Sequence, residues 1–531
     1  MISPVSAAPH RRRSLVAAAS LWTMSWICLG CEPIPPPMLT ETASVESTKA
    51  MNMGSPSPGV WHTRGATLLD PDGRPFKMVG LNWSGFETTN GIPGGLNQRD
   101  YKAVLRSIRD GGFNVIRLPL SNEMVESPHI PSGLEQRRPT GFINEDLRGL
   151  TSMQVLDKVV SYSQEIGLKL ILDNHRSNAG SGPQENGLWF TSAYPESSWL
   201  RDWASLARRY VNSPSVIGFD LRNETHGTSG SGACWDCGGE RDWHVAAQHA
   251  GNAILKENRN LLIIVEGVDE YGGDQYWWGG NLEGVRRSPV ILRTPNHLVY
   301  SPHEYGPVEY PQPWFTPTTS SQELEQTWVK HWAFISDMQI APVYIGEFGT
   351  PNDAASIESV EGGSQGQWYA TLVSFLSKRS MINWTYWSAN GEDRYAYFDP
   401  SYSQDHSSQL KMSSLDAIRG TIAVDMVPRT RGGFYAESSS PGGHTYTKTF
   451  TRIPTKRFRY QQQHYLNRDA DGLVSHEGVT TPPKARSRQI ALPQSQGGRR
   501  VPVPKPSRDS EARMVAASIR TAVADATSKV H

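Results

Sequence analysis

The sequence predicts an α/β protein, a closed (β/α)8 or TIM barrel with disordered N- and C-terminal extensions. Two observations lead to this prediction. Short, nearly continuous apolar runs alternate with longer amphipathic stretches, and eight such runs follow one another within residues 59–425. Continuous apolar strands are typical of parallel sheets whose faces are covered by helices. Eight of them over this length fit a barrel with some insertions.

The eight strands can be assigned in order from their β-branched and aromatic residues. They are expected at residues 76–82, 113–119, 168–173, 216–224, 261–267, 297–303, 342–348 and 382–388. Apolar residues at helical spacing fill the intervals, for example at residues 100–112, 152–167, 241–258 and 366–380. An open doubly wound sheet is the alternative, but the turn after the first strand has no GxGxxG phosphate signature, which disfavours it.

The two ends of the chain differ from this region. Residues 1–31 join a basic HRRR run to an apolar stretch, which is typical of an export signal peptide. That stretch ends in CLGC, similar to a bacterial lipoprotein box with Cys31 as the lipidated residue, so free secretion and a lipid anchor both stay open, as does twin-arginine export. No membrane span is expected in the mature chain. Residues 32–58 read as a Pro/Ser/Thr-rich tether.

Charge separates the C-terminal tail from the rest of the chain. The whole sequence has 52 basic and 52 acidic residues, so net charge offers no attraction to nucleic acid. Residues 426–531 are rich in Gly, Pro, Ser and Arg and are predicted to be disordered. Within them, residues 428–531 hold 18 Lys and Arg against 7 Asp and Glu. A solvated tail is favoured over one that binds an anionic polymer.

Two cysteines remain outside the signal segment, Cys234 and Cys237 in the motif ACWDC. A CxxC pair can form half of a zinc site or a redox motif, but no second CxxC or His pair accompanies this one. In an oxidising compartment the pair is predicted to form a small structural disulfide.

Polar residues follow the predicted strands at the edge where a barrel builds its active site. Among them are two carboxylates, Glu224 after the fourth strand and Glu347 after the seventh. One protonated and one ionised carboxylate can together cleave a glycosidic bond. A separation of roughly 5 Å indicates retention and one of roughly 6.5–9.5 Å indicates inversion. Sequence spacing does not decide between these, and Glu347 could also simply point into water.

Eight motifs in collinear order now indicate a family: GLNWSGFET, NVIRLP, LILDNHR, GFDLRNETH, YWWGGNL, VYSPHEY, IGEFGT and WTYWS. Together they resemble the barrel cellulases of glycoside hydrolase family 5, in particular the secreted bacterial endoglucanases. The resemblance assigns residues 59–425 to a catalytic domain. Residues 391–410 match poorly, so it does not define the subsites built there.

The resemblance implies an endo-β-1,4-glucanase that acts with retention through a covalent glycosyl-enzyme. Glu224 would be the acid/base and Glu347 the nucleophile, with no metal or cofactor. The expected partner is a β-glucan chain, and the expected state is a monomer. A β-mannanase or another β-glucanase remains an alternative because specificity resides in the loops, and so does a catalytically silent glucan-binding protein.

The same resemblance gives roles to other polar residues. Arg117 would keep the nucleophile ionised, and Tyr305 would donate a hydrogen bond to it. Asn223 would bind the 2-hydroxyl of the sugar at the cleavage point, and His175 and His303 would line the same subsite.

Aromatic residues would form the sugar platforms. The resemblance places Trp387 under the sugar at the cleavage point and gives Trp278 and Trp83 as rings that stack on neighbouring glucose units. Asp173 and Glu266 are interpreted as supporting carboxylates rather than catalytic ones.

Overall fold

The computed structural model describes residues 59–420 except residues 136, 140, 228–229 and 404–405. The predicted signal segment, lipidation at Cys31, the tether and the basic tail lie outside the described residues. Within the described part, no helix is both long and apolar enough to cross a bilayer.

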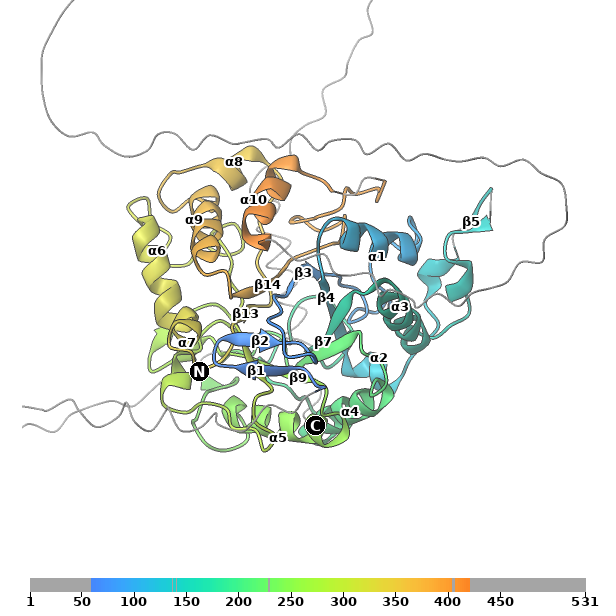
Figure 1. The fold of residues 1–531 in the computed structure, drawn as a ribbon, viewed down its shortest axis with the longest axis horizontal. Helices are drawn as coiled ribbons and strands as arrows, with labels where there is room; N and C mark the ends of the chain where they lie inside the picture. The colour runs from blue at the N-terminus through green and yellow to red at the C-terminus, as the bar shows by residue number, and fades with distance from the viewer. Residues whose placement is uncertain (1–58, 136, 140, 228–229, 404–405, 421–531) are drawn as a thin grey trace, which may run out of the picture. The chain divides into compact units, whose positions relative to one another are not determined.

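Eight parallel strands form one sheet that curves into a barrel (Figure 1). Their hydrogen-bonded order is β12-β9-β8-β7-β4-β3-β14-β13. Parallel bridges from Tyr300 to Val343 and from His303 to Glu347 close the ring between β12 and β13. The strands are β3 (Val79–Asn82), β4 (Val115–Ser121), β7 (Lys169–Arg176), β8 (Val216–Asp220), β9 (Leu262–Glu266), β12 (Leu298–Ser301), β13 (Tyr344–Ile345) and β14 (Asn383–Tyr386).

Every strand lies within or overlaps its predicted segment, so the prediction of a (β/α)8 barrel is confirmed. Most strands are shorter than predicted. In β8, β12 and β13 the predicted segments run on to Glu224, His303 and Glu347, which lie beyond the strand ends at the barrel mouth.

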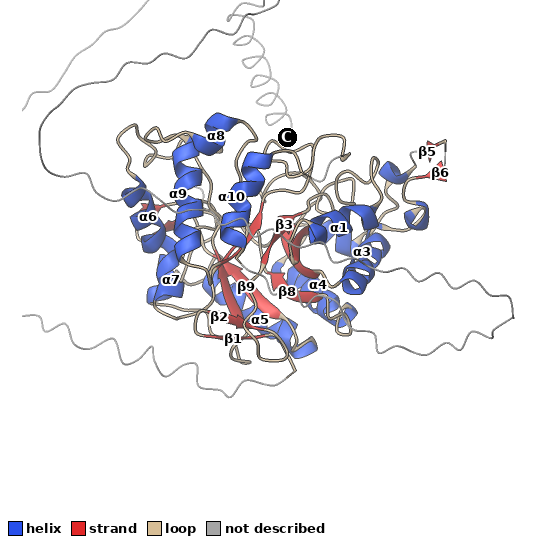
Figure 2. Ribbon diagram, turned by 45° about the horizontal axis from the view of Figure 1, so that its top comes forward, coloured by secondary structure: helices blue, strands red, loops and turns tan. Residues whose placement is uncertain are grey.

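Helices surround the strands on the outside (Figure 2). They are α1 (Tyr101–Asp110), α2 (Asn122–Glu126), α3 (Ser152–Ile166), α4 (Glu196–Arg209), α5 (Trp243–Glu257), α6 (Ser321–Trp328), α7 (Phe334–Asp337), α8 (Ala354–Glu358), α9 (Gln365–Lys378) and α10 (Gln409–Arg419). Local sequence sets their limits. Thr151 and Gln154 form a capping box at the start of α3, and Gly167 ends that helix with a φ of 84°, a conformation that glycine adopts without strain.

Two apolar cores hold the barrel together. The larger one fills the space between strands and helices. The smaller one lies inside the barrel, where residues such as Val115, Ile171 and Ile264 meet in layers. Trp61 and Leu68 pack into this inner core; Leu68 belongs to a hairpin of β1 (His62–Arg64) and β2 (Thr67–Leu69) that starts the described chain. The amino end of the barrel is therefore filled, and the open mouth is at the carboxyl ends of the strands.

The segment with the weakest family resemblance is nevertheless packed against the barrel. Tyr395, Tyr397 and Phe398 are buried, and the ammonium of Lys411 at the start of α10 donates to the carbonyls of Tyr395 (2.8 Å) and Ala396 (3.1 Å). Burial lowers the pKa of this ammonium to about 7. Residues up to 420 thus belong to the folded domain.

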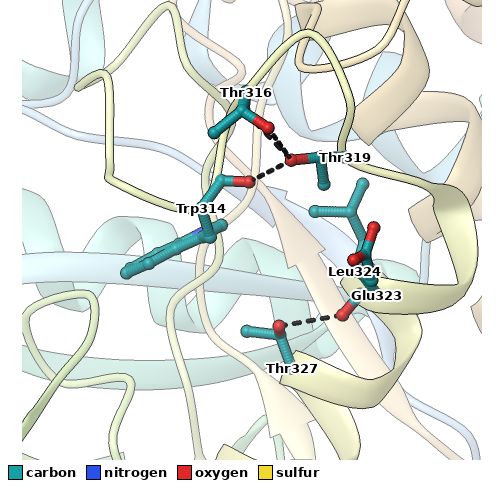
Figure 3. Close-up of a pocket in the computed structure, with 6 residues that line it drawn as sticks. All are labelled: Trp314, Thr316, Thr319, Glu323, Leu324 and Thr327. Carbon is teal, nitrogen blue, oxygen red and sulfur yellow. Dashed lines mark hydrogen bonds between the residues drawn. The ribbon is translucent and has the colours of Figure 1, made fainter.

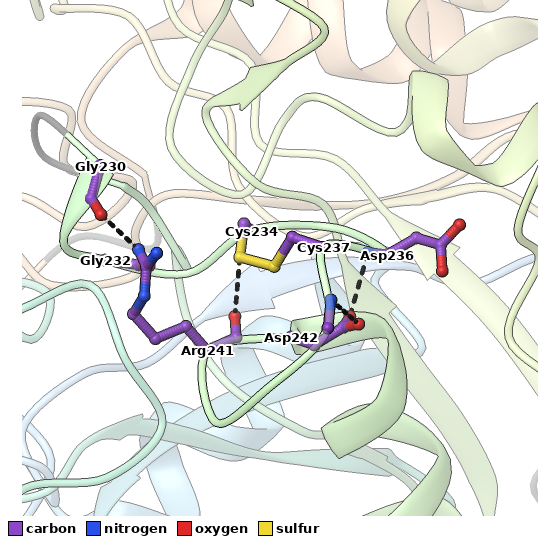
Figure 4. The surroundings of a disulfide bond; sticks show 8 residues. Gly230, Gly232, Cys234, Asp236, Cys237, Arg241 and Asp242 are labelled. Carbon is purple, nitrogen blue, oxygen red and sulfur yellow. Dashed lines mark hydrogen bonds between the residues drawn. A yellow bond between two sulfur atoms is a disulfide. The ribbon is translucent and has the colours of Figure 1, made fainter.

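The Cys234–Cys237 disulfide is present, which confirms that prediction (Figure 4). It lies in the loop before α5. The buried carboxylate of Asp242 accepts hydrogen bonds from the backbone N–H groups of Asp236 (3.0 Å) and Gly238 (2.9 Å). The bridge and this carboxylate together fix a loop that has no regular secondary structure of its own.

Candidate active site

A single guanidinium, that of Arg117 on β4, organises the barrel mouth. It is fully buried, and its Nη1 lies 2.7 Å from Oε1 of Glu347. It also contacts Asp220 at 2.9 Å and both Asp173 and Glu266 at 3.2 Å. Burial alone would lower the pKa of Arg117, but the four carboxylates raise it well above its usual value. Arg117 is therefore a permanent cation inside a strongly anionic cluster.

Glu347, just after β13, is surrounded by groups that favour its ionised form. The hydroxyl of Tyr305 donates to its Oε2 at 2.9 Å, and the Nδ1 of His303 lies 3.7 Å from the same oxygen. Burial would raise the pKa of this carboxyl, but His303, Arg117 and the Tyr305 hydroxyl outweigh it and hold the pKa below its ordinary value. Glu347 is thus a carboxylate anion near neutral pH.

Glu224, after β8, has the opposite character. Burial, helped by the negative charge of Glu347, raises the pKa of Glu224 to about 7, although a contact with His303 at 3.1 Å opposes the shift. Its backbone is unusual for a non-glycine residue, with a φ of 49°. A hydrogen bond of 2.7 Å from its N–H to Glu266 stabilises that conformation. Such strained positions are common at functional sites.

The two carboxylates face each other closely. One oxygen of Glu224, one of Glu347 and a ring nitrogen of His303 all lie within 4.8 Å of one another. This separation is close to the roughly 5 Å spacing of retaining glycosidases and shorter than the roughly 6.5–9.5 Å of inverting ones. Arg117 already supplies positive charge to Glu347 and to Glu266, so the donor set suits ion pairs better than a bound metal ion.

His175 and Trp387 form one wall of the site. The Nδ1 of His175 lies 2.7 Å from Oδ2 of Asp173, and burial lowers the pKa of His175 to about 3, so the ring is neutral. Its ring stacks on Trp387 with centroids 5.7 Å apart. The indole N–H of Trp387 donates to Asp393 at 3.1 Å, which fixes the orientation of this partly exposed ring.

Of the other tryptophans near the site, one is an exposed platform and two are buried. Trp278 is 45% exposed, and one face stacks on His226 at 3.8 Å, so its other face is available to a sugar. Its neighbour Trp277 is buried. Trp83 is also fully buried and donates to the carbonyl of Gly94 at 3.1 Å. The prediction that Trp83 stacks on glucose is therefore wrong in this structure, because its ring belongs to the core.

Two residues of the site were missed by sequence reasoning. Asp220 accepts a hydrogen bond from Arg117 at 2.9 Å, as the predicted site residue Asn223 does at 3.0 Å. Asp220 could have been found from the sequence, because it is an acidic residue inside an apolar strand, four residues before Glu224. Glu304, which is buried between His303 and Tyr305, was also missed.

A second hollow lies elsewhere on the protein (Figure 3). This pocket of about 160 Å³ is lined by Trp314, Thr316, Thr319, Glu323, Leu324 and Thr327. Its hydroxyl groups bind one another or nearby carbonyls; for example, Thr319 donates to the carbonyl of Trp314 at 2.7 Å. None of the residues around Arg117 lines it, so the chemistry belongs to the barrel mouth.

A buried, unequal carboxylate pair at the carboxyl ends of parallel barrel strands, flanked by aromatic rings, defines a barrel glycoside hydrolase. The cellulase model of glycosyl hydrolase family 5 matches residues 69–393, and the chain belongs to this family. The family assignment made from the eight sequence motifs is thereby confirmed.

Relatives support the same assignment. The chain is 44% identical over 336 residues to an endoglucanase of Paenibacillus polymyxa. This alignment covers 62% of this chain and 80% of that protein. It is 33% identical over 331 residues to the major extracellular endoglucanase of Xanthomonas campestris, covering 61% of this chain and 63% of the relative. Among solved structures, the endocellulase of Pyrococcus horikoshii in complex with cellotetraose has 31% identity and a TM-score of 0.61, covering 68% of this chain and all of that one.

Proposed function

We propose that this protein is an endo-β-1,4-glucanase that cleaves internal bonds of cellulose-like glucans with retention of configuration. The observation that carries the mechanism is the pair Glu224 and Glu347, with oxygens within 4.8 Å and pKa values shifted in opposite directions. Groups whose environments separate their pKa values in this way take the acid and base roles. The endoglucanase relatives support the substrate class.

In the first step, Glu347 attacks the anomeric carbon. The Arg117 guanidinium and the Tyr305 hydroxyl hold one oxygen each and so fix the direction of the attack. Glu224 gives its proton to the glycosidic oxygen as the bond to the leaving sugar breaks. The product of this step is a covalent ester between Glu347 and the glycone.

In the second step, the same two residues act in reverse. Glu224, now ionised, removes a proton from a water molecule that attacks the anomeric carbon from the side the leaving sugar has vacated. The bond to Glu347 breaks and its carboxylate is restored. Two inversions at one carbon give net retention.

The surrounding residues bind and orient the sugars. Asn223 would hold the 2-hydroxyl at the cleavage point, where a hydrogen bond gains strength in the transition state. Trp387 and His175 form the wall of that subsite, and Trp278 offers a free aromatic face to a neighbouring glucose unit.

The substrate is tested with a protein of residues 60–425 on carboxymethylcellulose, mixed-linkage β-glucan and galactomannan in parallel. New reducing ends should be released from the first two, and Glu224→Ala should release them roughly 10²–10⁴-fold more slowly. Cleavage of galactomannan alone would keep the chemistry and replace the substrate. Binding without cleavage would make the chain a glucan-binding protein.

We further propose that the enzyme acts outside the cytoplasm, either free or held by a lipid at Cys31. The basic and apolar N-terminal run supports export, and the Cys234–Cys237 disulfide suits an oxidising compartment. Labelling of growing cells with a clickable fatty acid, compared between the natural chain and Cys31→Ala, distinguishes the anchored form from the free one.

A further inference from the structure

Three successive residues after β12 hold the backbone or side chain of Glu347. The Nδ1 of His303 lies 3.7 Å from Oε2 of Glu347, and the Tyr305 hydroxyl donates to that oxygen at 2.9 Å. Between them, the backbone N–H of Glu304 donates to the carbonyl of Glu347 at 3.0 Å. The position of the Glu347 carboxylate therefore depends on where this three-residue segment lies.

The side chain of Glu304 points away from the cleft. Alternate residues of an extended chain face opposite sides, so His303 and Tyr305 face the barrel mouth while Glu304 faces the helices outside. Its side chain is fully buried. There the hydroxyl of Tyr276 donates to its Oε2, and the indole N–H of Trp368 on α9 donates to its Oε1 at 2.9 Å.

Two more tryptophans complete the surroundings of this carboxyl group. Burial raises the pKa of Glu304 to about 7, while the donors Tyr276 and Trp368 and the nearby indoles of Trp328 and Trp332 oppose the shift. The Trp332 N–H makes no hydrogen bond of good geometry within the described residues. Trp328 ends α6, and Trp332 lies in the π-helical turn Val329–Ala333 that follows it.

The same contacts extend to the aromatic platform. Tyr276 lies two residues before Trp278, and its ring stacks on His331 of the π-helical turn at 3.9 Å. A π-helical turn inside a helix is rare and is often found near functional sites. The carboxyl group of Glu304 thus connects three parts of the protein. These are the loop that carries Trp278, the helices α6 and α9, and the segment of residues 303–305 after β12 that contacts Glu347.

A contribution to stability alone does not explain why a carboxyl group is buried at position 304. A buried carboxyl is costly to desolvate even when it is hydrogen-bonded, and well-packed apolar residues of similar size often serve as well or better. The backbone two residues after Glu304 is also tightly packed. A Cβ added to Gly306 would lie 2.4 Å from the side chain of Gln365 and 2.7 Å from that of Trp368. Directional hydrogen bonds on a rigid segment suit a role in positioning.

We propose that Glu304 is a positioning residue for the reaction. Its side chain, held by Tyr276 and Trp368, fixes residues 303–305 so that His303 and Tyr305 keep Glu347 ionised and aligned for attack. This inference rests on the proposed role of Glu347 as nucleophile.

The test compares Glu304→Gln and Trp368→Phe with the control Glu325→Gln, a partly exposed residue on α6 whose side chain pairs with Lys378. In Glu304→Gln, an amide NH2 replaces one acceptor oxygen and cannot accept from its donor. We expect kcat to fall roughly tenfold to a hundredfold, the size of loss caused by misplaced reacting groups, with KM nearly unchanged. The acidic limb of the pH profile should move to higher pH. Trp368→Phe should show smaller changes of the same kind, and Glu325→Gln should show none.

A merely structural role would lower the melting temperature without moving kcat or the acidic limb, and that result in the folded variants would overturn the proposal. If Glu304→Gln does not fold, the same measurements on Trp368→Phe decide between the two roles.

The pKa of Glu347 gives a second test that does not depend on turnover. It can be measured by carbon-13 NMR of glutamate-labelled protein, with the signal assigned by comparison with Glu347→Gln. It should rise by roughly one unit in Glu304→Gln. Inactive natural enzyme would refute the proposed function, whereas an unchanged pKa of Glu347 would refute this inference alone.

Discussion

Arg117 and Glu347 form a buried ion pair of 2.7 Å inside the barrel, and Arg117 is shared with three further carboxylates. The pair joins stability to catalysis, since the same guanidinium that neutralises the cluster also keeps Glu347 ionised. Breaking one partner of such a cluster leaves uncompensated buried charge.

The first prediction concerns Arg117→Lys. An ammonium cannot reach all four carboxylates as the planar guanidinium does, so buried anions lose their partner. We expect the free energy of unfolding to fall by about 3–5 kcal/mol. We also expect the acidic limb of the pH profile to move to higher pH, because the pKa of Glu347 rises. Urea unfolding and kcat/KM against pH measure both effects. Arg74→Lys, at an exposed site, is the matched control, and equal behaviour of the two variants would contradict the account.

The second prediction concerns pH. Turnover requires Glu224 protonated and Glu347 ionised. Since the pKa of Glu224 is raised to about 7, kcat/KM should fall as pH rises through that value. Since the pKa of Glu347 is held below its ordinary value, the acidic limb should lie below pH 4.5. A profile on a soluble glucan that stays flat from pH 6 to 9 would contradict the assignment of Glu224.

Much of the site followed from one rule about parallel barrels. Because polar residues that follow buried strands meet at one edge, Glu224, Glu347, His175, His303 and Tyr305 could be grouped from sequence alone. The structure brings all five together. The ion pair between Arg117 and Glu347 could also be anticipated, because Arg117 is a basic residue inside an apolar strand.

Other features depend on packing that no local pattern reveals. Trp83 follows a strand as an active-site residue would, yet its ring turns into the core and donates to Gly94. Glu304 lies beside two site residues, but its role depends on Trp368 and Tyr276, which are remote in sequence. The carboxylate spacing also needs coordinates, since sequence distance carries no information about it.

A third prediction separates the two chemical steps with Glu224→Ala. A leaving group that needs no proton, such as dinitrophenolate, should still depart quickly, whereas cello-oligosaccharides should react roughly 10²–10⁴-fold more slowly. Azide, a nucleophile that needs no general base, should restore turnover of the dinitrophenyl cellobioside and give a β-glycosyl azide. Equal losses on both substrates, with no effect of azide, would assign the acid/base role elsewhere.

The fourth prediction uses the exposed platform. Trp278→Ala removes the ring that stacks on His226, and we expect KM for cellopentaose to rise severalfold with kcat changed less, because an aromatic contact contributes about 1 kcal/mol. Trp278→Phe should restore most of the affinity. An unchanged KM in Trp278→Ala would show that no sugar stacks there.

The central claim is that Glu347 becomes covalently attached to the sugar. In 2,4-dinitrophenyl 2-deoxy-2-fluoro-β-cellobioside, the fluorine slows both chemical steps, but the dinitrophenolate leaving group keeps the first step faster than the second. The ester with Glu347 therefore accumulates during incubation. Mass spectrometry of a peptic digest should place the fluorosugar on Glu347, and Glu347→Gln should take up none. A label on another residue, or an α-configured first product with no label at all, would contradict the account.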